Sequence, residues 1–401
     1  MFGPTRINKN APFLPLFKDR SMVGANFKEE CMIDIYGDLN NKDYLPQISE
    51  TELSDDQVLV ELSAIKKRLG NKVVVLGHHY QQDDVIAFAD ITGDSLELAR
   101  KAAEIKTAEY ILFCGVHFMA ETADMLTGES QKVILPDMRA GCSMADMANR
   151  REIDVAWKYL TECTSEKIVP ITYINCTAAL KSFVGEHNGS ICTSSNAEKV
   201  ITWGLSQGEK LLFFPDQHLG RNTCFKLGIK LEDMVIYDPR KRFGGLIPEE
   251  IQKAKVILWY GFCSVHQGFT PEHNKMWREK EPDRIRIVHP ECSFEVVQGA
   301  DLAGSTSFIV NQIKFAKPGT KFAVGTEINL VNRLSKEYPH LDITSLSPYQ
   351  CLCTTMYRIR PRWLLESYRA IEKNLPINVI QVDEVTKKFA LKALDQMLKI
   401  S

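Results

Sequence analysis

The chain has 401 residues, 44% of them apolar, and its 49 Lys and Arg residues almost balance 51 Asp and Glu residues. This composition is typical of a globular protein of two or three domains and excludes a mostly disordered chain. The net charge of -2 gives no electrostatic basis for binding nucleic acid, and no apolar run is long enough for a membrane helix. The first residues lack the apolar core of a signal peptide, so we expect a cytoplasmic protein with neither nucleic acid nor a membrane as partner.

The predicted elements begin after an N-terminal extension, residues 1–50, which has no clear period. Ser54 and Gln57 have the spacing of a capping box, and the helix that they begin should end at Gly70. Short apolar runs then alternate with helical stretches, which predicts an α/β protein with parallel sheets covered on both faces. The expected strands are 72–76, 110–113, 132–135, 168–174, 210–214, 255–259, 284–288 and 321–324.

Polar residues follow the ends of several predicted strands, where ligands bind in α/β sheets. His78 follows the first strand and could act as an acid, a base or a metal ligand, or could be a solvated loop residue. His289 and Glu291 follow a later strand, which fits general base chemistry, although Pro290 between them also fits a simple turn. The pattern recurs in three blocks of about 90 residues, which indicates an internal triplication.

Hydroxyl residues stand at three predicted helix starts, one in each block: Ser95, Ser194, and the pair Ser305 and Thr306. Free N–H groups at a helix start bind phosphate or carboxylate well. The alternative is that these residues are ordinary N-caps, as the spacing from Ser195 to Glu198 also predicts for a capping box. Three such starts favour a shared anionic substrate.

Eleven cysteines are present without a CxxC motif, so a local zinc finger is excluded. Cys142, Cys263 and Cys353 lie in polar or glycine-rich loops, which predicts that they bind a metal. Three thiolates would leave one open position on an iron–sulfur cluster or a zinc ion. Cys351 is expected to be a bystander that forms no disulfide with Cys353. The cysteines expected in the core or without a role are Cys114, Cys163, Cys176, Cys192 and Cys224.

The chain resembles the NadA-type quinolinate synthases over about residues 70–360. The stretches that carry the resemblance are LGHHYQ, FADITGDSLELAR, FCGVHFMAETADML, LPDMRAGCSMADM, YINCTAA, CTSSNAEKV, FFPDQHLG, GFCSVHQGFT, HPECSFEVV, GSTSFIV, VGTEINLVNRL and CLCTTMYRI.

The resemblance implies three similar αβα domains in a pseudo-threefold arrangement. It also implies one [4Fe–4S] cluster per chain, bound at the centre by Cys142, Cys263 and Cys353, with one open iron that acts as a Lewis acid. The expected divisions are an extension over 1–50, domains over 51–158, 159–248 and 249–345, and the third ligand loop with C-terminal helices over 346–401.

The implied reaction condenses iminoaspartate with dihydroxyacetone phosphate to give quinolinate, phosphate and water, in de novo NAD biosynthesis. An aspartate-oxidising enzyme is the implied partner. The proposed catalytic residues are Glu291, Tyr80 and His78. His266 is expected to position a ligand or the substrate, and Phe118 and Met119 to wall the site. The implied substrate-binding residues are His78, Ser95, Tyr173, Asn175, Ser194, His289, Glu291, Ser305 and Thr306.

Two other functions compete with this interpretation. An iron–sulfur sensor or regulatory protein could use the same fold without turnover, but it should have lost part of the residue set, which is intact here. A structural zinc protein could use the same three thiols, and acid-labile sulfide would distinguish the two.

Overall fold

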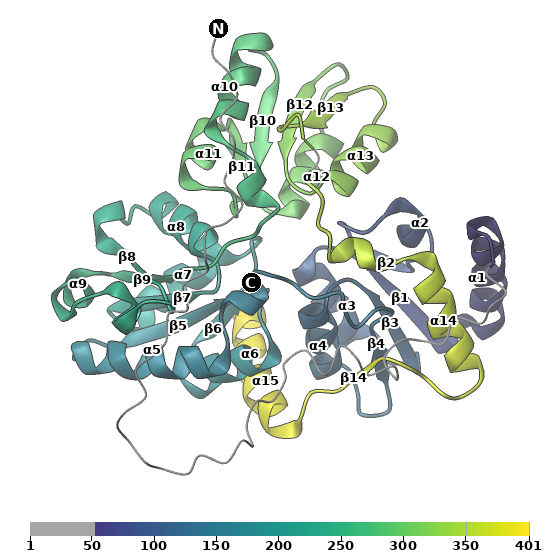
Figure 1. Ribbon diagram of the computed structural model, residues 1–401, viewed down its shortest axis with the longest axis horizontal. Coiled ribbons are helices and arrows are strands. Elements are labelled where there is room, and N and C mark those ends of the chain that lie inside the picture. Colours follow the sequence, from purple (N-terminus) through teal and green to yellow (C-terminus); the bar gives the residue numbers. More distant parts are fainter. Residues whose placement is uncertain (1–52, 350, 401) are drawn as a thin grey trace, which may run out of the picture. The chain divides into compact units, whose positions relative to one another are not determined.

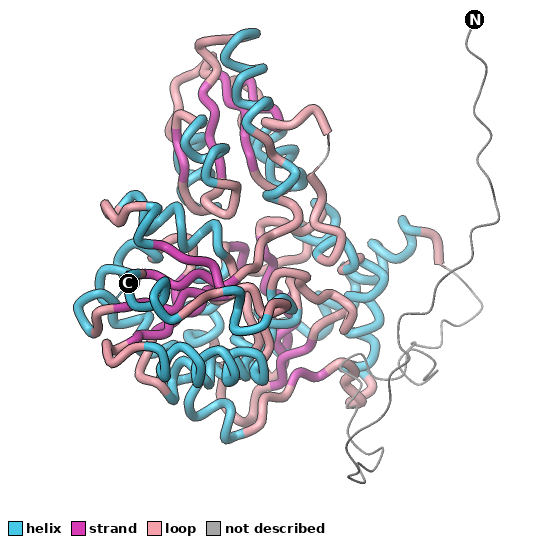
Figure 2. The backbone as a smooth tube through the Cα atoms, turned by 60° about the vertical axis from the view of Figure 1, so that its left-hand side comes forward, coloured by secondary structure: helices cyan, strands magenta, loops and turns pink. Residues whose placement is uncertain are grey.

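Three separate β-sheets organise the part of the chain that the computed structural model describes, residues 53–349 and 351–400 (Figure 1). From Leu53 onward the chain forms one compact unit. Helices lie on both sides of the strands, as Figure 2 shows, so the predicted α/β fold of three parallel-sheet αβα units is confirmed. The expected extension, residues 1–50, lies outside the described residues, and the predicted domain boundaries stay a prediction.

The first sheet has the strand order β14-β4-β3-β1-β2, and all its pairs are parallel except β14 with β4. The central strands β1 and β3 are almost fully buried, as a sheet covered on both faces requires. Its strands are β1 (Val73–His78), β2 (Ile91–Gly93), β3 (Tyr110–Cys114), β4 (Lys132–Ile134) and β14 (Val379–Ile380). Its helices are α1 (Asp55–Leu69), α2 (Asp83–Ile86), α3 (Ser95–Glu104) and α4 (His117–Leu126).

The second sheet is entirely parallel, in the order β6-β5-β7-β9-β8. Its strands are β5 (Ile168–Tyr173), β6 (Ser190–Cys192), β7 (Lys210–Phe214), β8 (Met234–Tyr237) and β9 (Val256–Trp259). Its helices are α5 (Arg150–Cys163), α6 (Ala178–Glu186), α7 (Ala197–Gln207), α8 (Gln217–Lys226) and α9 (Pro248–Lys253). Two 3-10 turns, η4 (Leu231–Asp233) and η5 (Arg242–Gly245), flank β8.

The third sheet is parallel and smaller, in the order β11-β10-β12-β13. Its strands are β10 (Ile285–Val288), β11 (Leu302–Ala303), β12 (Lys321–Gly325) and β13 (Asp342–Ser345). Its helices are α10 (Pro271–Lys280), α11 (Phe294–Gly299), α12 (Thr306–Lys314) and α13 (Ile328–Glu337).

The segment after the third sheet returns to the first two. Helix α14 (Pro361–Glu372) packs on α1, β14 adds an antiparallel edge to the first sheet, and α15 (Glu384–Ile400) packs on α6. The contact between α15 and α6 is so close that a Cβ atom on Gly185 would lie 1.9 Å from the Phe389 carbonyl oxygen. The C-terminal helices therefore bind two different parts of the molecule, and Figure 1 shows their yellow ribbons in both places.

The predicted strands are all present, whereas the short edge strands β2, β6, β8, β11, β13 and β14 were not predicted. The capping box at Ser54 is also confirmed, because its hydroxyl accepts from the Gln57 N–H while Gln57 accepts from the Ser54 N–H. The capping box predicted at Ser195 is wrong. Helix α7 has Asn196 as its N-cap residue, and the Ser195 hydroxyl donates instead to Asp94 at 2.9 Å.

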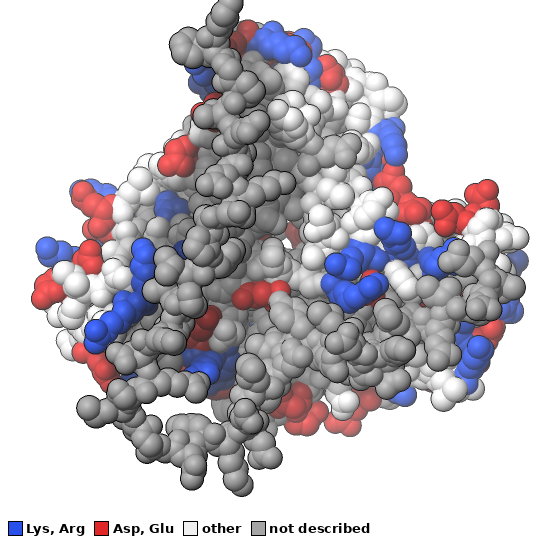
Figure 3. Space-filling model, in the orientation of Figure 1, with Lys and Arg blue, Asp and Glu red and all other residues white. Residues whose placement is uncertain are grey.

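Among the described residues, no helix combines the length and the apolar character needed to cross a membrane. Figure 3 shows Lys and Arg interspersed with Asp and Glu over much of the described part of one face. This distribution agrees with the balanced charge of the sequence.

Candidate active site

A cavity of about 650 Å³ lies where loops from all three sheets come together. His78 ends β1, Tyr173 ends β5 and His289 follows β10, so the cavity is at the carboxyl ends of the strands. Every site residue predicted from the sequence lines this cavity except Ser305. The lining residues are His78, Tyr80, Asp94, Ser95, Val116, Phe118, Met119, Cys142, Met144, Tyr173, Asn175, Thr193, Ser194, Cys263, Val265, His266, His289, Glu291, Thr306, Cys353, Thr355 and Met356.

The three cysteines that line the cavity lie in loops of the same local structure. The carbonyl oxygens of Cys142, Cys263 and Cys353 each accept from the N–H four residues later, at 3.1, 3.0 and 3.0 Å. A 3-10 turn begins three residues after each cysteine, and a longer helix begins eight residues after it. The turns are η3 (Ala145–Met147), η6 (His266–Gly268) and η7 (Met356–Arg358), and the helices are α5, α10 and α14.

This shared geometry distinguishes Cys353 from its neighbour Cys351. Cys351 lies two residues too early in the motif, and its thiol is buried against Gly268 and near the Tyr349 carbonyl. Both cysteines are free, as predicted. The repeated loop therefore includes Cys353 and leaves Cys351 in the core.

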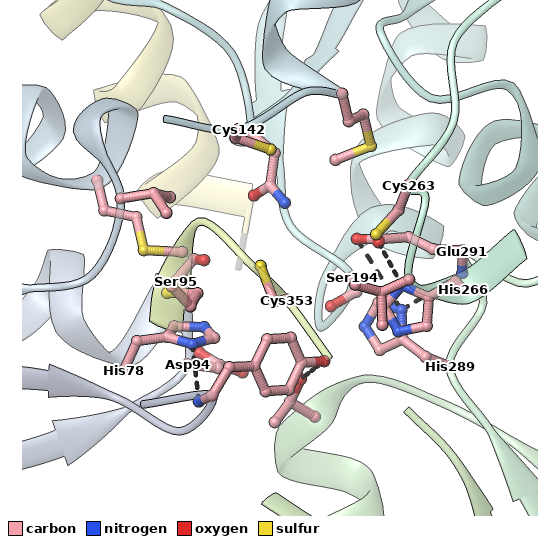
Figure 4. Close-up of a pocket in the computed structure, with 18 of the residues that line it drawn as sticks. His78, Asp94, Ser95, Cys142, Ser194, Cys263, His266, His289, Glu291 and Cys353 are labelled. Carbon is pink, nitrogen blue, oxygen red and sulfur yellow. Dashed lines mark hydrogen bonds and ion pairs between the residues drawn. The ribbon is translucent and has the colours of Figure 1, made fainter. Parts of the chain in front are cut away.

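The three thiols surround one space, as Figure 4 shows for Cys142, Cys263 and Cys353. Burial is the main cause that raises the pKa of all three thiols, to about 12 for Cys142. Cys142 and Cys353 raise the pKa of Cys263 further, because thiolates so close together repel each other. Three buried thiolates at this place therefore need a bound cation, and three sulfur donors suit zinc or iron.

Glu291 is fully buried at one side of the cavity and has two close partners. The Tyr173 hydroxyl donates to Oε1 at 2.6 Å, and Oε2 lies 2.8 Å from His266 Nδ1. Burial alone would raise the pKa of Glu291, but His266, His289 and the Tyr173 hydrogen bond outweigh it and lower the pKa to about 2. His289 stacks on His266, with ring centroids 4.6 Å apart. The Glu291 side chain is therefore a carboxylate at neutral pH.

Tyr80 and His78 lie together on the loop after β1. The Tyr80 hydroxyl is 2.7 Å from Thr326 Oγ1 and 3.0 Å from Thr306 Oγ1. Burial and the charge of Glu291 raise the pKa of Tyr80 well above its usual value, so the phenol keeps its proton. Burial, together with His79 and Arg333, lowers the pKa of His78 to about 3, which makes His78 neutral.

The helix starts meet at a buried carboxylate, Asp94. One oxygen of Asp94 caps α3 by accepting from the Leu96 and Glu97 N–H groups. The other oxygen accepts from the hydroxyls of Ser195, at 2.9 Å, and Ser307, at 2.7 Å. Asp94 thus bonds to residues at all three helix starts. Sequence reasoning did not assign it a role.

Ser95, Ser194 and Thr306 line the cavity beside this carboxylate, whereas Ser305 does not. The Ser305 hydroxyl accepts from the Phe308 N–H at 3.2 Å and so caps α12. Ser305 therefore has the geometry of an ordinary N-cap, which is one of the two interpretations of this residue from the sequence.

Comparison with known proteins identifies the chain. The family described as "Quinolinate synthetase A protein" matches residues 61–399. The chain belongs to this family. A quinolinate synthase of Bacillus subtilis (strain 168) is 52% identical over 362 residues, which cover 90% of this chain and 98% of that protein. The quinolinate synthase of Geobacillus sp. (strain WCH70) is 51% identical over 362 residues, which cover 90% of this chain and 97% of that protein. That of Bacillus pumilus (strain SAFR-032) is 53% identical over 348 residues, which cover 86% of this chain and 94% of that protein.

The family is one of iron–sulfur enzymes, and the donor set of the three cysteine loops fits such a centre. A second group of possible ligands, Cys263, His266 and Glu291, has donor atoms within 4.8 Å of one another. Two of these residues already form an ion pair, with His266 Nδ1 2.8 Å from Glu291 Oε2. This pairing favours the three thiols over the mixed group as the place for a metal.

Two further residues, one at the start of α13 and one within it, bind the backbone of site loops and were not predicted from the sequence. Glu327 is fully buried and caps α13, and its Oε1 also accepts from the Cys353 N–H at 3.3 Å. Arg333 donates to the carbonyl oxygens of His79 and Gln81, on both sides of Tyr80. Both residues lie in a stretch that resembles the family, but only their position after β12 could have indicated a role.

Proposed function

We propose that this chain condenses iminoaspartate with dihydroxyacetone phosphate to form quinolinate, with release of phosphate and water, in de novo NAD biosynthesis. The family match and the names of the relatives support the proposal. The observation that carries it is the cavity, in which three thiols, the carboxylate of Glu291 and the protonated phenol of Tyr80 face one space.

The proposed cofactor is one [4Fe–4S] cluster held by Cys142, Cys263 and Cys353, which leaves one iron without a protein ligand. When bound, the cluster supplies a Lewis acid at that iron. The three loops of equal geometry support this ligand set, since a structural zinc site takes four protein ligands and only three are supplied by the repeated loop.

The anionic groups of the substrates bind, in this proposal, at the three helix starts. Ser95, Ser194 and Thr306 present hydroxyls there, and helix N-termini favour phosphate and carboxylate. Asn175 adds an acceptor, because among the described residues nothing donates to its buried Oδ1 atom. An N–H or O–H group of the substrate would satisfy that oxygen.

Glu291, Tyr80 and His78 are the proposed catalytic residues, and each has a different role in the proton transfers or in binding the substrate. The carboxylate of Glu291 accepts a proton, held in place by Tyr173 and His266. Tyr80 keeps its proton at neutral pH and can donate it. The neutral imidazole of His78, whose ring centroid lies 4.8 Å from that of Tyr80, binds the substrate across the cavity from Glu291. Phe118 and Met119, both buried in the cavity wall, exclude water that would hydrolyse an imine.

The proposed partner remains an aspartate-oxidising enzyme, because a readily hydrolysed imine must be made close to its point of use. Cytoplasmic location likewise stays a prediction. The regulatory alternative has no support from the family or from the relatives, which are named as synthases.

The test is anaerobic purification, measurement of iron and sulfide, and an assay of quinolinate by chromatography and mass spectrometry. Iminoaspartate is generated in the assay from oxaloacetate and ammonia, with dihydroxyacetone phosphate added. We expect about four iron atoms and four sulfides per chain. Loaded protein that forms no quinolinate would refute the activity, and zinc without sulfide would refute the cluster.

Glu291→Gln provides the matched control for that assay. Glutamine keeps the size of the side chain but cannot accept a proton, so kcat should fall about 100-fold to 10,000-fold. Iron content should stay at the wild-type level because Glu291 is not among the proposed ligands. A variant with wild-type turnover would remove Glu291 as the base.

A further inference from the structure

The third sheet supplies a buried hydroxyl that connects the two sides of the cavity. Thr326 follows β12 directly and has no exposed surface. Its Oγ1 lies 2.7 Å from the Tyr80 hydroxyl and 3.2 Å from His266 Nε2. Since His266 Nδ1 lies 2.8 Å from Glu291, a continuous polar path runs from Tyr80 to Glu291.

In the described part of the chain, Tyr80 and His266 are the side-chain hydrogen-bond partners of Thr326. The adjacent helix α13 is capped by Glu327, not by Thr326. Thr326 is also absent from the cavity lining, so it does not contact a substrate bound there. A fully buried hydroxyl is costly unless it is hydrogen-bonded, and its side-chain bonding partners here are two residues of the site.

The backbone around Thr326 is fixed by the neighbouring strand. The carbonyl oxygen of Gly325 accepts from the His289 N–H at 3.0 Å, which joins the ends of β12 and β10. The position of Thr326 is therefore set by the same strand end that carries His289 and Glu291. Tyr80, by contrast, comes from the first sheet, 246 residues away in the sequence.

A hydroxyl is suited to this position because it donates one hydrogen bond and accepts two. It can accept from Tyr80 and donate to an unprotonated Nε2, or accept from both Tyr80 and a protonated Nε2. In either state of the imidazole, the bonds to Tyr80 and to His266 are both kept. A methyl group at this place would leave both partners without the bond.

We infer that Thr326 is a positioning residue that holds Tyr80 and, through His266, Glu291 in a fixed relation across the cavity. The inference rests on the proposed function, because Tyr80 and Glu291 are the proposed acid and base. Proton transfer demands hydrogen-bond geometry at each end, and small displacements of the groups have large effects on rate.

The decisive pair of variants is Thr326→Val and Thr326→Ser. Valine has the shape of threonine without the hydroxyl, whereas serine keeps the hydroxyl. We expect Thr326→Val to lower kcat for quinolinate formation about 10-fold to 100-fold, since misplaced catalytic groups cost this much. KM and the iron content should stay near wild type, and Thr326→Ser should restore most of kcat. Thr344→Val, a half-buried threonine in β13 of the same sheet, should behave as wild type.

A second measurement does not depend on turnover. In protein labelled with ¹³C at the tyrosine Cζ atoms, the Tyr80 resonance is identified by its loss in Tyr80→Phe. We expect this resonance to move in Thr326→Val and to return in Thr326→Ser, because its hydrogen bond is lost and restored.

Wild-type kcat in Thr326→Val, an unmoved Tyr80 resonance, or equal impairment in the valine and serine variants would each overturn the inference. If wild-type protein forms no quinolinate, the proposed function fails. The Tyr80 resonance then still decides whether the Thr326 hydroxyl holds Tyr80.

Discussion

The three cysteine loops share one pattern. In each, the cysteine carbonyl accepts a hydrogen bond from the N–H four residues later, and a helix begins eight residues after the cysteine. The three helix starts around the cavity share no such pattern. Asp94 caps α3, Ser305 caps α12, and α7 begins after Asn196, whose side chain accepts from Thr193. One part of the site is thus a repeated unit, whereas the capping residues of the helix starts differ from one start to the next.

This difference matches what each part is proposed to bind. Three equal loops present three equal thiols, as a compact metal centre requires. The proposed substrates carry chemically different anionic groups, and each group needs its own set of donors. The triplication therefore explains the ligand loops well and the substrate contacts poorly, and the variants below test both halves of this comparison.

The largest effect should come from the cysteine loops. Cys142→Ala, Cys263→Ala and Cys353→Ala should each lose most of the bound iron, because a cluster held by three thiolates loses a third of its protein ligands. Iron and sulfide analysis after anaerobic purification measures this loss.

Cys351→Ser is the matched control, since Cys351 lies two residues from Cys353 but outside the repeated loop. It should keep wild-type iron content. Iron loss in Cys351→Ser together with retention in Cys353→Ala would show that the loop geometry does not identify the ligand.

A smaller effect should follow from loss of the carboxylate at the helix starts. Asp94→Ala removes a helix cap and two bonds to hydroxyls, so we expect a loss of about 3 kcal/mol in the free energy of unfolding. Urea unfolding followed by circular dichroism measures it. Ser195→Ala and Ser307→Ala each remove one of these bonds and should cost about 1 kcal/mol. If Asp94→Ala cost no more than either serine variant, Asp94 would not be the common partner of the three starts.

The smallest effects separate Ser305 from its neighbour Thr306. Ser305→Ala should lower the free energy of unfolding by about 1 kcal/mol, the usual cost of losing an N-cap, and leave KM for dihydroxyacetone phosphate unchanged. Thr306→Ala should instead raise KM, because Thr306 lines the cavity and bonds to Tyr80. A raised KM in Ser305→Ala would return Ser305 to the set of substrate-binding residues.

The sequence predicted the fold well where the signal was local. The buried central strands read as continuous apolar runs, and the cysteines stood out because their loops were polar. The edge strand β2 has only three residues, one of them exposed, so its pattern was too short to detect. His78, His289 and Glu291 were found because they follow predicted strand ends. The roles of Tyr80, Tyr173 and Asn175 came from the resemblance to the family.

The residues that sequence reasoning missed act over long distances in the chain. Asp94 and Ser307 are 213 residues apart, and Tyr80 and Thr326 are 246 apart. Asp94 reads locally as an ordinary capping residue, and Thr326 reads as the end of a buried strand. No local pattern shows that either side chain meets another sheet, since that depends on how the three sheets pack.

The path of the chain after Cys353 has a consequence for how the protein is made. The third thiol is supplied only once residue 353 has been synthesised, and α14 and α15, which pack on α1 and α6, come later still. The second and third sheets are complete by that point and can fold as they leave the ribosome, whereas the first sheet still lacks its edge strand β14. Until α14 arrives, however, the apolar face of α1 formed by Val58, Leu62 and Ile65 has no cover from it. All three thiols can therefore act together only after residue 353 has been synthesised, and α1 lacks the helix that packs on it until residues 361–372 have followed.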